Sequence, residues 1–86
     1  MNGRMKRYHG MMKTVLEYLA AGNELSQSDA ADLWREFNLR NKISQLGHDD
    51  WPILRRDEPS KRGGKYKVYY LDPDRSKWPY DPLASA

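Results

Sequence analysis

The chain has 86 residues, of which 38% are hydrophobic and 31% charged, and this composition predicts one small folded domain with a single modest core. Because the chain contains no cysteine, disulfides, thiolate nucleophiles and the common zinc-finger ligand sets are excluded. No apolar run approaches the roughly 20 residues that cross a bilayer, and no apolar signal segment follows the basic N-terminus. We therefore expect a soluble cytoplasmic protein without a membrane partner.

The net charge of +3 is distributed unevenly along the chain. Residues 1–13 and residues 59–71 each contain four basic side chains and no acidic one, and residues 38–48 add two more basic side chains. Residues 14–37 contain five acidic side chains against one arginine. Three separate basic segments indicate a surface that attracts a polyanion, although lysines that only maintain solubility give the same pattern.

The first periodic segment is predicted to be a helix from about Gly10 to Ala21. Its apolar side chains recur at helical spacing at Met12, Val15, Leu16 and Leu19. Gly22-Asn23 tolerates the left-handed conformation that ends a helix. Glu24-Leu25 then begins a short segment that is able to pair as an edge strand.

Two further helices are predicted in the middle of the chain. Ser26 and Asp29 approximate a capping box, which marks the start of the second helix. We expect the core-facing side of this helix to consist of Ala30, Leu33, Trp34 and Phe37. Asn38 is expected to cap a third helix that Gly47 ends. The predicted buried face of this third helix is Leu39, Ile43 and Leu46.

The exposed side of the third helix is predicted to be rich in hydrogen-bonding groups. At 100° per residue, four polar side chains lie opposite the apolar face: Asn41, Ser44, Gln45 and His48. Asparagine and glutamine suit a bidentate pair with adenine, and Arg40 suits guanine. Such a face favours readout of bases in a DNA major groove, although any solvated helix face has a similar composition.

The second half of the chain predicts a β-hairpin. Trp51-Pro52-Ile53 leads into an extended segment, Gly63-Gly64 allows the positive φ of a turn, and residues 66–71 form the return strand. The turn is basic because it contains Lys61, Arg62 and Lys65. A basic turn can approach phosphates or a minor groove, but an ordinary soluble turn has the same composition.

Aromatic side chains supply much of the predicted core. In a domain this small we expect Trp34, Phe37 and Trp51 to be buried. Tyrosines on the return strand could stack on single-stranded bases, but two strands make too small a platform. The proline-rich tail is expected to be extended, and its Trp78-Pro79-Tyr80 segment is expected to pack back on the domain or to contact a second subunit.

Catalytic groups are sparse. His48-Asp49-Asp50 could bind a metal or act in acid–base chemistry, yet His9 is the only other imidazole. The glycines of the hairpin turn lack the strand-to-helix context of a phosphate-binding loop. We therefore expect no enzyme activity, no metal and no cofactor.

The order helix, short strand, helix, helix and two-stranded hairpin resembles the winged helix-turn-helix family over residues 10–71. It is similar to small helix-turn-helix proteins of phages and prophages, whose third helix runs through a glycine into an aromatic-Pro-Ile strand, as Leu46-Gly47 and Trp51-Pro52-Ile53 do here. The resemblance implies an α+β fold of three helices with a two-stranded wing, with or without a short third strand. A basic arm (residues 1–9) and a Pro/aromatic tail (residues 72–86) flank this domain.

The resemblance also implies a DNA-binding surface. The third helix enters the major groove, and the wing contacts the backbone or the minor groove. The implied base contacts are Arg40, Asn41, Ser44 and Gln45; Lys42 lies at the flank, and the implied wing contacts are Lys61, Arg62 and Lys65. From charge and position alone, we expect further phosphate contacts from Gln27, Ser28, Arg55 and Arg56, and from Arg4, Lys6 and Arg7 of the arm.

These features favour sequence-specific binding of double-stranded DNA by a small transcriptional regulator, such as a dimeric repressor that reads two half-sites. Such a protein would be associated with the nucleoid of a bacterial cell or a phage-infected host. An excisionase-like factor that bends DNA for recombination, bound as a cooperative assembly, would use the same surface. An adaptor that binds a host or phage protein through this surface is the third alternative, and its binding would depend far less on salt.

Overall fold

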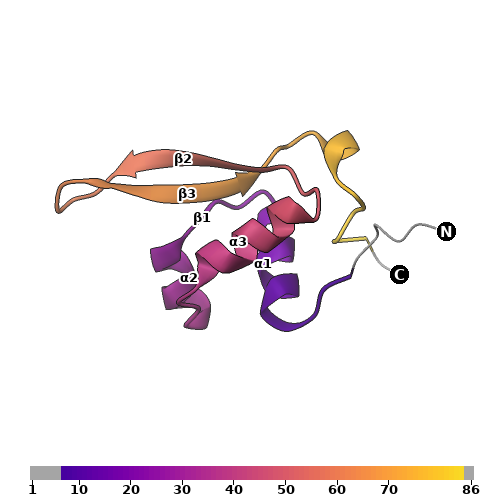
Figure 1. Ribbon diagram of the computed structural model, residues 1–86, viewed down its shortest axis with the longest axis horizontal. Helices are drawn as coiled ribbons and strands as arrows, with labels where there is room; N and C mark the ends of the chain where they lie inside the picture. The colour runs from indigo at the N-terminus through magenta and orange to yellow at the C-terminus, as the bar shows by residue number, and fades with distance from the viewer. Residues whose placement is uncertain (1–6, 85–86) are drawn as a thin grey trace.

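The computed structural model describes residues 7–84 as an α+β fold with three helices on one side of a three-stranded antiparallel sheet (Figure 1). The elements in chain order are α1 (Gly10–Ala20), β1 (Leu25–Ser26), α2 (Gln27–Trp34), α3 (Leu39–His48), β2 (Ile53–Pro59), β3 (Lys65–Leu71) and the 3-10 turn η1 (Arg75–Lys77). Within the described residues, no helix has the length and apolar character needed to cross a membrane.

The sheet has the strand order β1-β3-β2, so β3 is central. The predicted hairpin is confirmed, with Ile53 opposite Leu71 and Pro59 opposite Lys65. Its turn contains two consecutive glycines with φ angles of 87° and 78°, which side chains with a Cβ rarely adopt. The short third strand is β1, in which Leu25 pairs with Tyr69. Figure 1 shows that the turn end of the hairpin projects beyond the helices.

The core lies between α1, α3 and the sheet. The predicted apolar faces of both helices face the core. Met12 is only partly buried, and the other predicted side chains are buried: Val15, Leu16, Leu19, Leu39, Ile43 and Leu46. Leu25 of β1 and Leu71 of β3 close this core from the sheet. Burying one leucine side chain stabilises a fold by about 1.5–3 kcal/mol, so these contacts hold α3 firmly against α1 and the sheet.

Helix α2 is shorter than its apolar pattern predicted. The capping box is confirmed, because the Ser26 hydroxyl accepts from the Asp29 backbone N–H (3.1 Å) and the Asp29 carboxylate accepts from the Ser26 N–H (3.0 Å). The helix stops at Trp34 because Arg35 adopts a left-handed conformation with φ 55°. The predicted burial of Leu33 and Phe37 is therefore wrong, and these side chains are 52% and 76% exposed.

The ends of α3 also differ from the prediction. Asn38 is the N-cap residue, but its side chain makes no capping hydrogen bond. Instead, the side-chain oxygen of Gln27 accepts from the Leu39 N–H (2.9 Å), so a residue of α2 caps α3. Gly47 does not end the helix, which continues to His48. The left-handed residue that follows is Asp50, with φ 74°.

The segments before α1 and after β3 pack on the same domain. Trp51 is only 3% exposed, and its ring lies 6.3 Å from the Trp78 ring and 5.1 Å from the Tyr80 ring. Tyr8 is 8% exposed, and its hydroxyl donates to Asp49 at 2.6 Å. The expected intramolecular docking of the tail is thus confirmed. The tail is not wholly extended, because it contains η1.

Candidate nucleic-acid interface

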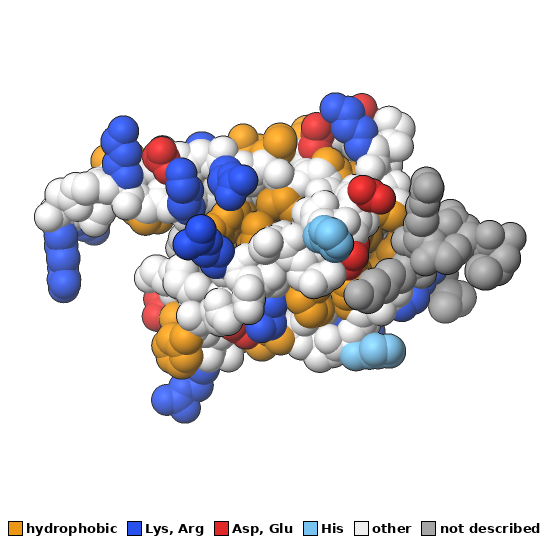
Figure 2. Space-filling model, viewed as in Figure 1, with side chains coloured by type: hydrophobic (Ala, Val, Ile, Leu, Met, Phe, Trp, Pro, Cys, Tyr) orange, Lys and Arg blue, Asp and Glu red, His pale blue; other side chains and the backbone are white. Residues whose placement is uncertain are grey.

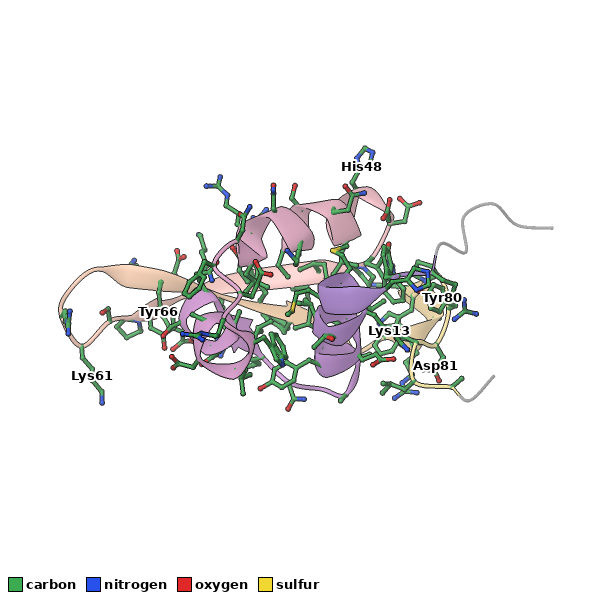
Figure 3. The ribbon with its side chains drawn as sticks, turned by 90° about the horizontal axis from the view of Figure 1, so that it is seen from below. Lys13, His48, Lys61, Tyr66, Tyr80 and Asp81 are labelled. Atoms are coloured by element: carbon green, nitrogen blue, oxygen red, sulfur yellow. The ribbon has the colours of Figure 1, made fainter. Side chains whose placement is uncertain are left out.

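The polar side of α3 faces solvent as predicted. Its exposed side chains are Arg40, Asn41, Ser44, Gln45 and His48. Asn41 and His48 occupy the centre of this side, because they are directed at about 200° and 180° from Leu39 at 100° per residue. In Figure 3, His48 projects from the end of α3 away from the other helices. The buried leucines behind this side fix its position relative to the sheet.

One flank of α3 faces the sheet across a hollow of about 310 Å³. The hollow is lined by Arg40, Ile43, Ser44, Gly47, Ile53, Arg55 and Tyr69. Arg40 and Ser44 come from α3, whereas Arg55 comes from β2. The fold therefore brings two arginines that are far apart in the sequence to one depression.

The other flank of α3 is held by acidic neighbours. The Lys42 ammonium lies 3.0 Å from the Glu36 carboxylate. That contact and the Asn38 backbone N–H lower the pKa of Glu36, because both stabilise its charged form. The Gln45 amide nitrogen lies 3.3 Å from both carboxylate oxygens of Asp49. Lys42 is therefore an engaged cation, and Gln45 is held at one end of the exposed face.

The basic side chains of residues 7–84 divide into two groups. Six have an acidic partner within the ion-pair distance, in the pairs Lys13–Glu17, Lys42–Glu36, Arg56–Glu24, Lys67–Asp57, Arg75–Asp81 and Lys77–Asp72. Among residues 7–84, the basic side chains that form no ion pair are Arg7, Arg35, Arg40, Arg55, Lys61, Arg62 and Lys65. Five of these seven lie on α3 or the hairpin.

Figure 2 shows Lys and Arg side chains gathered beside α3 and along the hairpin, on the face where α3 is exposed, with apolar side chains between them. Arg35, at the end of α2, lies outside this group. The fold therefore places two arginines without an ion pair, Arg40 and Arg55, beside the polar face of α3, and the remaining unpaired hairpin cations at the hairpin turn.

Arg56 is held by two glutamates within the protein. Its guanidinium donates to both oxygens of Glu24, at 2.7 Å and 2.5 Å, and also to Glu58. These carboxylates raise the pKa of Arg56, and the guanidinium in turn lowers the pKa of Glu24. The group connects β2 to the segment before β1, and it is already neutralised by two acids.

The other expected phosphate contacts are arranged as follows. Lys61, Arg62 and Lys65 are exposed at the hairpin turn, but Lys61 points to the opposite side from His48 in Figure 3. Ser28 is exposed in the first turn of α2. Gln27 is exposed too, but its side chain is engaged in capping α3.

The basic arm lies only partly within the described residues. Arg4 and Lys6 are outside residues 7–84. The Arg7 guanidinium lies 4.1 Å from the centre of the Tyr80 ring, so Arg7 contacts the tail. Arg7 therefore lies with the packed chain ends, away from the hairpin turn.

Sequence reasoning did not find the hollow beside α3. The hollow is formed in part by side chains of β2 and β3, and their distance to α3 depends on tertiary packing. One signal was available, because Gly47 is a glycine within a helix, where it lowers helix stability by about 1 kcal/mol relative to alanine. Such a residue indicates either a helix end or a place where something approaches the backbone closely.

Comparison with protein-family models, with curated proteins and with solved structures gave no match to this chain. Among the described residues, no group of three His, Asp or Glu side chains is arranged to hold a metal ion. What the molecule binds is therefore inferred from the arrangement of its own side chains.

Proposed function

We propose that this protein is a sequence-specific DNA-binding protein of the winged helix-turn-helix type, acting as a small transcriptional regulator. The element order, the sheet order β1-β3-β2 and the closely spaced α2 and α3 support this proposal. The observation that carries it is the coincidence of two features on one side of the molecule. The polar face of α3 is exposed there, and Arg40 and Arg55 beside it form no ion pair within the described residues.

Helix α3 has the dimensions and chemistry of a reading helix. A helix with its side chains is about 10–12 Å across and the major groove is about 12 Å wide, so the ten residues of α3, about 15 Å long, fit within it. Asn41, Ser44 and Gln45 offer donors and acceptors to base edges, and each well-made bidentate pair discriminates by about 1–3 kcal/mol. The apolar anchors on the opposite side keep these groups from rotating into the core.

The unneutralised cations supply affinity that does not depend on sequence. Each contact between a basic side chain and a phosphate releases counterions from the duplex, so that affinity falls with salt. An ion-paired lysine such as Lys67 gains less from a phosphate, because its bond to Asp57 (2.7 Å) would have to be given up. Arg40, Arg55, Lys61 and Arg62 have no ion pair to give up within the described residues.

The proposal is tested by selecting duplexes from a random pool with the full chain and measuring their affinities. We expect enrichment of a defined motif. The Asn41→Ala and Gln45→Ala variants should lose about 10-fold to 100-fold in discrimination between this motif and its single-base variants, because each removes a base contact. Asn23→Ala is the matched control, since Asn23 is an exposed amide whose side chain donates to Tyr18 O, away from α3.

Two outcomes would contradict the proposal. The first is that no duplex binds even at low salt. The second is that the control variant changes sequence preference as strongly as Asn41→Ala does. Far-ultraviolet circular dichroism and urea unfolding of each variant show whether a loss of binding reflects a loss of folding.

A further inference from the structure

The hollow between α3 and β2 contains two positive groups without a negative one. Arg40 and Arg55 both line it, and neither forms an ion pair within residues 7–84. Their basic neighbours differ, because Arg56 pairs with two glutamates and Lys67 pairs with Asp57. Two arginines that line one depression bring like charges to the same part of the surface, and an anion bound there would be attracted by both.

The rest of the lining is suited to a ligand that has an apolar part beside its charged group. Ile43, Ile53 and Tyr69 contribute apolar surface, and Ser44 contributes a hydroxyl group. A volume of about 310 Å³ is at the low end of small-molecule sites, which span about 300–1,000 Å³. A phosphodiester with its sugar combines an anion with an apolar ring and is small enough for such a space.

Gly47 leaves this side of α3 without a side chain. A Cβ atom built at Gly47 has no heavy atom within 4 Å, so packing within the protein does not require glycine here. Gly47 also has no positive φ angle, so its backbone conformation is open to any residue. Gly47 is the second-last residue of α3, and glycine lowers helix stability by up to about 1 kcal/mol relative to alanine. A ligand that approaches the helix backbone closely would account for this glycine.

We propose that this hollow binds one backbone phosphate of the duplex, with the phosphate between Arg40 and Arg55 and the adjoining sugar against Gly47. This inference rests on the proposed function and deepens it. It assigns Arg40 to the backbone, whereas the resemblance assigned it to a base. Base reading then belongs to the other three implied base contacts, Asn41, Ser44 and Gln45.

The first experiment compares Arg40→Gln and Arg55→Gln with the matched control Arg75→Gln, an arginine already paired with Asp81 in the tail. Wild-type binding to the selected duplex is measured first, at several salt concentrations. We expect each hollow variant to weaken binding to every duplex by a similar factor. Affinity falls as salt rises, so the slope of log K against log salt is negative. Its magnitude should become smaller by about 0.9 for each arginine removed, and the control variant should leave it unchanged.

Each result of this experiment has a defined meaning. If wild type binds no duplex, the proposed function fails and the inference fails with it. If wild type binds and Arg40→Gln changes the preferred base at one position, Arg40 reads a base and the inference alone is overturned. If wild type binds and neither hollow variant changes affinity or slope, the phosphate lies elsewhere and the inference is again overturned.

The second experiment uses Gly47→Ala, which cannot act through charge. Because alanine favours the helix and its methyl group meets no protein atom, we expect the midpoint of thermal unfolding to rise. We also expect duplex affinity to fall about tenfold or more, because the methyl group occupies space that the sugar needs. A purely structural role for Gly47 cannot produce a more stable protein that binds more weakly. Unchanged or tighter binding would overturn the inference.

Discussion

Two regions of the molecule differ in how their aromatic and basic side chains are packed and paired. Where the chain ends pack, the rings of Tyr8, Trp51, Trp78 and Tyr80 lie together, and we call these four residues the terminal cluster. Cations near it are engaged, such as Lys77, which lies 3.2 Å from Asp72. Five other cations, on α3 and the hairpin, are exposed and form no ion pair within residues 7–84: Arg40, Arg55, Lys61, Arg62 and Lys65.

This contrast assigns folding stability to the terminal cluster and binding to the hairpin turn. The terminal cluster buries large apolar surface in a chain of only 86 residues, which needs such contacts to offset the conformational entropy of folding. The hairpin turn contributes little to the core, because every residue from Lys61 to Tyr66 is exposed. Substitutions in the terminal cluster should therefore change unfolding, and substitutions in the hairpin turn should change binding.

The largest effect is expected at Trp51. Replacing this 3% exposed side chain by alanine removes its contacts with Trp78 and Tyr80, and we expect a loss of about 3–5 kcal/mol in the free energy of unfolding. Urea unfolding measures it. Phe37→Ala is the control, because a side chain that is 76% exposed should cost less than about 0.5 kcal/mol. Equal costs for the two aromatic residues would contradict this assignment of the core.

A smaller effect is expected at the start of α2. Ser26→Ala removes the hydroxyl that accepts from the Asp29 N–H, and we expect a loss of about 1 kcal/mol, within the usual range of about 0.5–2 kcal/mol for a cap. Ser28→Ala, in the exposed first turn, should cost clearly less. Thermal and urea unfolding measure both variants. A larger loss for Ser28→Ala would show that the cap does not determine where α2 begins.

The smallest effect is expected at Tyr8, as a dependence of the free energy of unfolding on pH in the alkaline range. Burial, together with the hydrogen bond to Asp49 and its charge, raises the pKa of Tyr8 above its ordinary value of about 10. The folded state thus favours the neutral phenol, so this stabilisation is complete below about pH 10 and is lost as pH rises further. Unfolding of Tyr8→Phe between about pH 8 and pH 11.5 should depend less on pH than that of wild type. The exposed Tyr66→Phe is the control, and an equal change in both variants would contradict the account.

The parts of the fold that sequence predicted are those set by local patterns. The 3.6-residue period determines the buried faces of α1 and α3, and the hydroxyl and carboxylate three residues apart determine the start of α2. The burial of Leu33 and Phe37 could not be predicted correctly because α2 ends at Arg35. The periodic pattern continues past this point, and arginine rarely adopts the left-handed conformation that stops the helix.

The candidate site was predictable only on its helical side. The exposure of Asn41, Ser44 and Gln45 follows from one helix and its apolar face. Which cations are neutralised does not follow from sequence, because Arg56 and Glu24 are 32 residues apart and Arg55, its neighbour, has no acidic partner within the described residues. The sequence shows a basic segment, and only the packed structure shows which of its charges are available.

The salt dependence of duplex affinity tests the central claim most directly. The variant with Lys61→Gln and Arg62→Gln removes two unneutralised cations, and the variant with Arg75→Gln and Lys77→Gln removes two ion-paired ones. Both lose the same formal charge. We predict that the hairpin variant has a weaker salt dependence, with the magnitude of the slope of log K against log salt smaller by about 1.8. We predict that the tail variant leaves this slope unchanged. Equal slopes in the two variants, or a wild-type affinity that does not depend on salt, would contradict the account.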